Sequence, residues 1–137
     1  MIRQAVRPKA TKMALPRQFR LIRLELAREA GHPGGSRQHG YRLVAPLDAD
    51  GRIEPALWKL HRDACRVVRF RPDEDDEVGH LVQKGDGTWA FHYDVRGNEE
   101  DEAGYRFGDE RFVIGEYVSI HEEGALHTFQ VTSVEHV

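Results

Sequence analysis

Apolar and polar residues alternate most regularly in the last quarter of the chain, residues 105–137. Val118 and Ile120 fall on one face of one run, and Phe129 and Val131 fall on one face of the next. Successive side chains of a β-strand point to opposite sides, so this period of two predicts strands. The runs are rich in β-branched and aromatic residues, and a glycine-containing turn separates them. We therefore predict an antiparallel hairpin in this segment.

The same alternation predicts strands nearer the N-terminus, at residues 41–47 and 66–71. Residues 19–26 allow two interpretations, which are a helix buried on all sides and a strand interrupted by a bulge near Leu21 and Ile22. We favour the strand, because apolar residues alternate with arginine and glutamate on each side of that bulge.

Residues 79–95 predict a second hairpin, which turns at residues 84–87. A two- or four-residue loop would pair Val82 with Trp89 and would place His80 opposite Phe91. The inner face would then be aromatic and apolar, made of Trp89, Phe91, Tyr93 and Val95. The outer face would carry Ala90, His92 and Asp94. A further hairpin is predicted to turn at Gly108 and Asp109, with Tyr105 opposite Phe112.

One main helix is predicted at about residues 54–65, with Pro55 in its first turn, where a missing N–H costs nothing. Its apolar stripe recurs at helical spacing and consists of Leu57, Trp58, Leu60, His61, Ala64 and Cys65. Together these elements predict an α+β domain. Its mostly antiparallel sheet of about seven strands is curled or barrel-like, and the helix closes one side or end.

The charge of the chain is divided unevenly between its two parts. Residues 1–42 hold ten Lys/Arg and two Glu, a balance of +8, whereas residues 43–137 hold ten Lys/Arg and 21 Asp/Glu, a balance of −11. Residues 1–16 are basic and poor in apolar residues, so they are predicted to be a disordered tail, with Met13 as an alternative start. Residues 17–137 are predicted to form one domain.

Composition limits the class of protein. The chain has 39% hydrophobic and 31% charged residues, which is typical of a globular protein, and it has no apolar run long enough for a membrane helix. A single cysteine is compatible with a reducing cytoplasm. The acidic body would repel phosphates, so a nucleic-acid partner is disfavoured. The basic tail keeps nucleic-acid contact open as a third functional class.

Three residues could provide a metal site. His61 and Cys65 are four apart on the predicted helix and would face the same way, and His80 could supply a third ligand. Three protein ligands and an open position suit a transition metal such as zinc. The alternative is that all three residues are structural, because no CxxC, HxxxH or HExxH motif is present. A thiol nucleophile at Cys65 with His61 as base is a weaker hypothesis, since a buried thiol resists ionisation.

Other polar segments are better explained as turns and loops. Residues 48–53 resemble part of a calcium loop but lack the bidentate glutamate, so they predict a turn. The acidic runs at residues 73–77 and 99–102 predict solvated loops. His92 and Asp94 would share an outer strand face, either as a small polar site or as a surface pair.

Several stretches of the chain resemble a small family of bacterial proteins with no assigned activity. The resemblance is carried by residues 19–26, 40–51, 104–109 and 115–120, and it extends over about residues 17–137. It leaves the basic tail outside and implies no catalytic residue, cofactor or partner.

Two main functional classes follow from these patterns. The first is a small non-catalytic cytoplasmic module that binds a protein or a small molecule, without a required cofactor. Trp58, Trp89, Phe91 and Tyr93 would be its core or the floor of a shallow pocket. The second is a metal-binding protein or metal-dependent enzyme that uses His61, Cys65 and His80.

Overall fold

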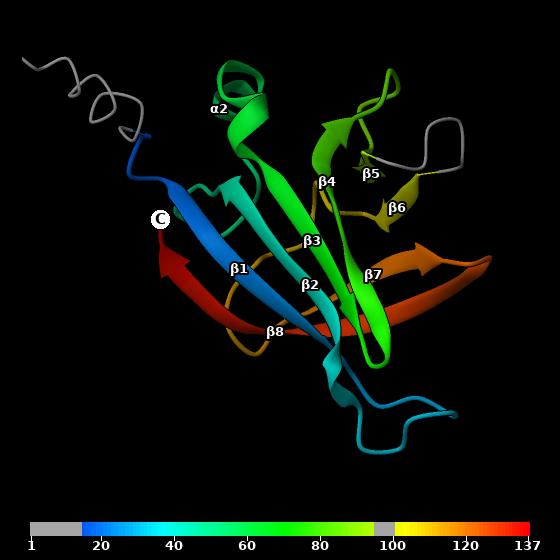
Figure 1. Ribbon diagram of the computed structural model, residues 1–137. Helices are drawn as coiled ribbons and strands as arrows, with labels where there is room; N and C mark the ends of the chain where they lie inside the picture. The colour runs from blue at the N-terminus through cyan, green and yellow to red at the C-terminus, as the bar shows by residue number, and fades with distance from the viewer. Residues whose placement is uncertain (1–14, 95–100) are drawn as a thin grey trace, which may run out of the picture.

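The computed structural model describes residues 15–94 and 101–137. Eight strands pair antiparallel in chain order, and the last pairs with the first to close a barrel (Figure 1). The strands are β1 (Phe19–Leu26), β2 (Ser36–Pro46), β3 (Arg66–Arg71), β4 (Glu74–Gln83), β5 (Trp89–Tyr93), β6 (Glu102–Tyr105), β7 (Tyr117–Glu122) and β8 (Ala125–His136). The predicted antiparallel, barrel-like sheet is confirmed, but it has eight strands rather than about seven.

The predicted hairpin near the C-terminus is present as β7 and β8. Val118 lies opposite Phe129 and Ile120 opposite His127. The strands are joined at Glu123 and Gly124, whose φ angles of 50° and 82° are both positive. Two positive φ values are those of a two-residue turn whose twist matches that of the strands. The alternation buries Val118, Ile120, Phe129 and Val131 inside the barrel, as their period predicts.

Residues 19–26 form a strand and not a helix. The β1–β2 register runs without a shift from Phe19 opposite Pro46 to Glu25 opposite Gly40. The bulge predicted near Leu21 and Ile22 is therefore absent from the β1–β2 pairing. Leu21 points outward and is 37% exposed, while Ile22 is fully buried.

The helix is shorter than predicted. The α-helix α2 spans Pro55–Leu60, and a separate 3₁₀ turn, η2, spans Arg62–Ala64. Trp58 is the helical side chain that is buried, whereas Leu60 is 75% exposed, so the predicted stripe does not form one packed face. The chain must leave the helix axis here because Cys65 already belongs to the core beside the start of β3. Figure 1 shows α2 above the end of the barrel at which β2 ends and β3 begins.

The β4–β5 hairpin has a different register from the one predicted. Gln83 pairs with Trp89 and His80 pairs with His92, because the connecting loop has five residues, 84–88. An odd loop length changes the parity of the pairing, and a shift of one residue moves every side chain of a strand to the other face. Trp89, Phe91 and Tyr93 are buried as predicted, but His80 lies on the outer face.

The segment between β6 and β7 is not a hairpin. Tyr105 pairs with Ser119 of β7 instead of lying opposite Phe112. Phe107 and Phe112 are both buried, and their rings meet edge to face with centroids 5.3 Å apart. The backbone N–H of Phe112 donates to the carbonyl of Gly51 at 2.7 Å, so this segment and the one before α2 close the same end of the barrel.

Two predictions concern residues partly outside the described structure. Residues 1–14 of the basic tail and residues 95–100, which include Val95 and part of an acidic run, lie outside it. Residues 73–77 were predicted as a solvated loop, but four of these acids belong to β4.

No helix within residues 15–94 and 101–137 is long and apolar enough to cross a membrane.

Candidate functional site

The structure does not bring the three predicted metal ligands together. The Cys65 thiol is buried and donates to the backbone carbonyl of His61 at 3.6 Å, and the His61 ring packs edge to face on Phe19. Burial raises the pKa of the Cys65 thiol to about 12, so the thiolate that a metal or a nucleophilic mechanism needs is strongly disfavoured. His80 lies on the outer wall with Asp94. Among the residues that the structure describes, no group of three His, Cys, Asp or Glu side chains could hold a metal.

The four aromatic residues predicted as core or pocket floor are all buried. The Trp58 and Trp89 rings meet at right angles with centroids 5.1 Å apart, and Trp58 Nε1 donates to the Leu81 carbonyl at 2.8 Å. Phe91 and Tyr93 have no exposed surface. These side chains therefore fill the barrel and do not line an open pocket.

Two histidine–carboxylate pairs lie on the outer faces of β4 and β5. His80 Nδ1 is 3.2 Å from Asp94, and His92 Nδ1 is 2.7 Å from Asp101. The sequence suggested a polar site made of His92 and Asp94, but each of these residues has a different partner. Both pairs are partly exposed, and we interpret them as ordinary surface ion pairs.

The first unusual site is a network of charged and hydroxyl groups inside the barrel, away from the α2 end. Tyr41 donates a hydrogen bond to Glu122, and its oxygen is 2.9 Å from Glu102 Oε1. Tyr93 donates to the same Glu102 oxygen at 2.7 Å. Glu102 is 4% exposed and Glu122 is 1% exposed. Buried acids of this kind are rare unless they are paired.

Arginines from β3 supply the positive charge of this network. Arg69 Nη1 is 2.6 Å from Glu77, and its Nε is 3.2 Å from Glu102 Oε2. Arg71 Nη2 is 3.2 Å from Glu122 Oε1. The acidic groups on β4, β6 and β7 therefore compensate the two arginines on β3.

The surroundings shift the pKa values of the two buried glutamates in opposite directions. Burial raises the pKa of Glu102, and the hydrogen bond from Tyr93 and the charge of Arg69 only partly offset it. Burial also opposes ionisation of Glu122, but hydrogen bonds from His39 and Tyr41 and the charge of Arg71 outweigh it and lower its pKa to about 2. The surroundings therefore favour the protonated form more at Glu102 than at Glu122.

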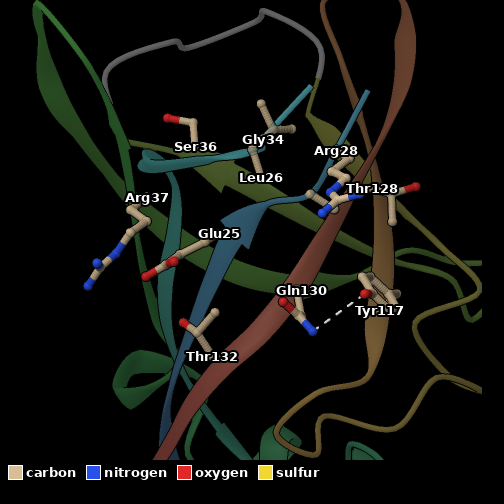
Figure 2. A pocket seen from close by; sticks show the side chains of 11 residues that line it. Glu25, Leu26, Arg28, Gly34, Ser36, Arg37, Tyr117, Thr128, Gln130 and Thr132 are labelled. Atoms are coloured by element: carbon tan, nitrogen blue, oxygen red, sulfur yellow. Dashed lines mark hydrogen bonds between the residues drawn. The ribbon is translucent and has the colours of Figure 1, made fainter. Parts of the chain in front are cut away.

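The second site is a groove of about 590 Å³ on the outside of the barrel. It is lined by Glu25, Leu26, Ala27, Arg28, Gly34, Ser36, Arg37, Tyr117, Thr128, Gln130 and Thr132. Its floor is the outer face of β8, where alternate residues present Thr128, Gln130 and Thr132. Figure 2 shows Gln130 between Arg37 on one side of the groove and Tyr117 on the other.

An irregularity in β2 shapes this groove. One step along β1, from Glu25 to Leu26, corresponds to four steps along β2, from Gly40 to Ser36. Residues 37–39 are therefore left out of the β1–β2 ladder. Bulges re-aim side chains and are common beside functional sites. Here the bulge places Arg37 at the groove and His39 at the interior network, where its Nε2 is 3.2 Å from Glu122.

Sequence reasoning missed both sites. Glu102 stands at the end of an acidic run that predicts a loop, and its burial has no local signal in the sequence. The signal available for the groove was the strict alternation of polar residues along β8, which was used only to identify the strand. No protein-family model, curated protein or solved structure matches the chain.

Proposed function

We propose that the protein is a small, non-catalytic binding module that holds a small polar molecule in the groove of β1, β2, β7 and β8. The observation that carries this proposal is the groove itself, whose volume of about 590 Å³ is within the usual range of small-molecule sites. Its lining offers hydroxyl, amide, carboxylate and guanidinium groups.

The state of the interior supports an external site. Antiparallel barrels of eight strands have room either for their own side chains or for one small ligand. In this barrel the rings of Tyr41, Phe91 and Phe129 are fully buried, and the centroids of Phe91 and Phe129 are 5.0 and 5.2 Å from that of Tyr41. The interior network next to them is internally hydrogen-bonded. A ligand would thus be bound on the wall and not inside the barrel.

The single cysteine is buried and unpaired, which fits a reducing compartment. We therefore place the module in the cytoplasm.

The test is a fragment screen by two-dimensional ¹⁵N NMR with a library of small polar compounds. We expect hits whose shifted amides cluster at residues 25–28, 34–37 and 128–132. Gln130→Trp would fill the groove and abolish these shifts, whereas Val78→Trp on the outer face of β4 would preserve them. Hits that persist in Gln130→Trp, or shifts that scatter over the barrel, would disprove the proposal.

A further inference from the structure

We propose that the ligand of the groove is a small hydroxyl-rich molecule that carries an oxyanion, such as a sugar acid or a sugar phosphate. This inference rests on the proposed function and adds the chemical class of the ligand. It follows from three features of the groove: its two arginines, its polar floor and its exposed aromatic ring.

Two arginines at the groove have no ion pair with any residue that the structure describes, and the one carboxylate of the lining, Glu25, is paired with Arg23. Arg28 and Arg37 line the groove, and their guanidinium groups have no acidic or carbonyl partner within residues 15–94 and 101–137. The neighbouring arginines differ. Arg23 Nε is 2.8 Å from Glu25, and Arg42 contacts Asp76. A planar guanidinium group with no protein acceptor can bind a carboxylate or phosphate through two parallel hydrogen bonds.

The position of Arg37 depends on the bulge in β2. A regular ladder would continue pairing β2 with β1 after Gly40, and residues 37–39 would then belong to the wall. Because these residues leave the ladder, Arg37 lies at the rim of the groove on the side opposite Tyr117, with its guanidinium group pointing away from Gln130 (Figure 2). An irregular backbone at this point therefore adds a cation to the groove.

The floor of the groove suits hydroxyl groups. Gln130 makes only long contacts, 3.4 Å to the Gly115 carbonyl and 3.5 Å to the Tyr117 hydroxyl, so its amide can exchange them for a ligand. Thr128 and Thr132 add hydroxyl groups that can donate or accept. Glu25 accepts from Arg23 through Oε2, which leaves its other oxygen to accept from a ligand hydroxyl.

An aromatic ring completes the site. Tyr117 is 57% exposed at the groove, so its ring is accessible to a ligand. Its ring offers an apolar face, and its hydroxyl offers a hydrogen-bonding group. Figure 2 shows Arg28 on the same side of Gln130 as Tyr117 and Arg37 on the opposite side. The C–H face of a sugar ring could pack on Tyr117 while the anionic group contacts one of these two arginines.

The experiment compares four probes by NMR titration of the full chain: glucuronate, glucose 6-phosphate, glucose and inorganic phosphate. We expect the two sugar anions to bind more tightly than glucose by at least about tenfold, since charge-assisted hydrogen bonds are roughly twice as strong as neutral ones. Inorganic phosphate should bind more weakly than glucose 6-phosphate, because it lacks the hydroxyl contacts. Preference between glucuronate and glucose 6-phosphate identifies the anionic group.

A pair of variants locates the charge. Arg28→Gln combined with Arg37→Gln should remove most of the preference for anions and should make affinity insensitive to salt. Lys59→Gln, which removes an exposed cation from another hollow of the surface, is the matched control and should change neither. Arg28, Arg37 and Lys59 are all exposed, so neither the double variant nor the control should lose stability.

The outcomes separate this inference from the proposed function. If glucose and the sugar anions bind at the groove with equal affinity, the inference is wrong and the binding module stands. If anions bind tightly but the double variant retains that affinity, the assignment of the arginines is wrong. If none of the four probes shifts groove amides while other polar fragments do, the ligand belongs to another class. Failure of every compound in both experiments rejects the binding module itself.

Discussion

At the scale of single residues, the interior network contains more oxygen–oxygen contacts than hydroxyl protons. Tyr41 approaches Glu122 and Glu102, and Tyr93 approaches Glu102, which makes three contacts for two hydroxyl protons. If Glu102 is a neutral carboxylic acid, its own proton can form the hydrogen bond to the Tyr41 oxygen. The pKa of Glu102, which burial raises, agrees with this count. Glu122 beside Arg71 is then the ionised partner.

Two amide substitutions test this distribution of protons. Glu102→Gln replaces a neutral acid by a neutral amide that can still donate to Tyr41, so we expect it to cost less than about 1 kcal/mol at pH 7. Glu122→Gln removes the buried carboxylate beside the half-buried Arg71, which then keeps only the exposed Glu123 as a partner, and should cost about 3 kcal/mol or more. Urea unfolding of each variant measures the free energy of unfolding. Equal losses in the two variants would mean that both carboxyl groups are ionised.

The same variants give a pH dependence whose sign is fixed by the pKa of Glu122. Its folded-state pKa is lowered to about 2, below the ordinary value of 4.5, so its contribution to stability is present above pH 4.5 and is lost as the pH falls toward 2. The difference in stability between wild type and Glu122→Gln should therefore shrink over that interval. This follow-up uses the same unfolding measurement at several pH values.

At the scale of elements, the sequence predicted periods well and registers poorly. The period of two identified β7 and β8 because each of these strands buries only one face. The β4–β5 register was wrong because residues 84–88 are equally compatible with even and odd loops, and the parity depends on the hydrogen bond from Lys84 N–H to the Thr88 carbonyl. The bulge at residues 37–39 and the buried Glu102 depend on contacts between distant strands. Local patterns contain no information about such contacts.

The packing of β2 against β1 gives a prediction at this scale. Gly40 lies where the two strands approach closely, and a Cβ at this position would be 1.9 Å from the Leu24 carbonyl oxygen, a backbone atom that cannot easily move. Gly40→Ala should therefore lower the free energy of unfolding by about 2–3 kcal/mol. Gly85→Ala is the control, because nothing lies within 4 Å of its added Cβ. Thermal unfolding of both variants checks this, and a harmless Gly40→Ala would show that the strands can separate without cost.

At the scale of the whole molecule, the two ends of the barrel are stabilised by different means. The end below α2 is closed by aromatic side chains, with Trp58 on Trp89 and Phe107 on Phe112. The interior network occupies the other part and connects β2 and β3 to β5, β6 and β7 through the barrel. Directional bonds between these groups add to the specificity of the strand arrangement that apolar packing provides at the other end.

Within residues 15–94 and 101–137, β6 is the strand with the fewest paired residues, and the network lies beside it. β6 makes two residue pairs with β5 and two with β7, whereas β1 makes eight with β2. Amide hydrogen exchange should therefore be faster in β6 than in the other strands, including β1 and β8, where the barrel closes. Glu102 begins β6 and bonds to Tyr41 on a strand that is not its neighbour.

Removal of that bond should open the wall locally. In Glu102→Ala we expect faster exchange at residues 103–105 and at the paired residues Ser119 and Ile120, with protection of β1 and β8 retained. The control is Glu29→Ala, which removes the contact of a partly buried carboxylate with His127 and should affect only the β1–β2 connection and the start of β8. Uniform acceleration over all eight strands would instead show that the barrel opens as one cooperative unit. In that case the network would stabilise the whole fold and would not act as a local brace for β6.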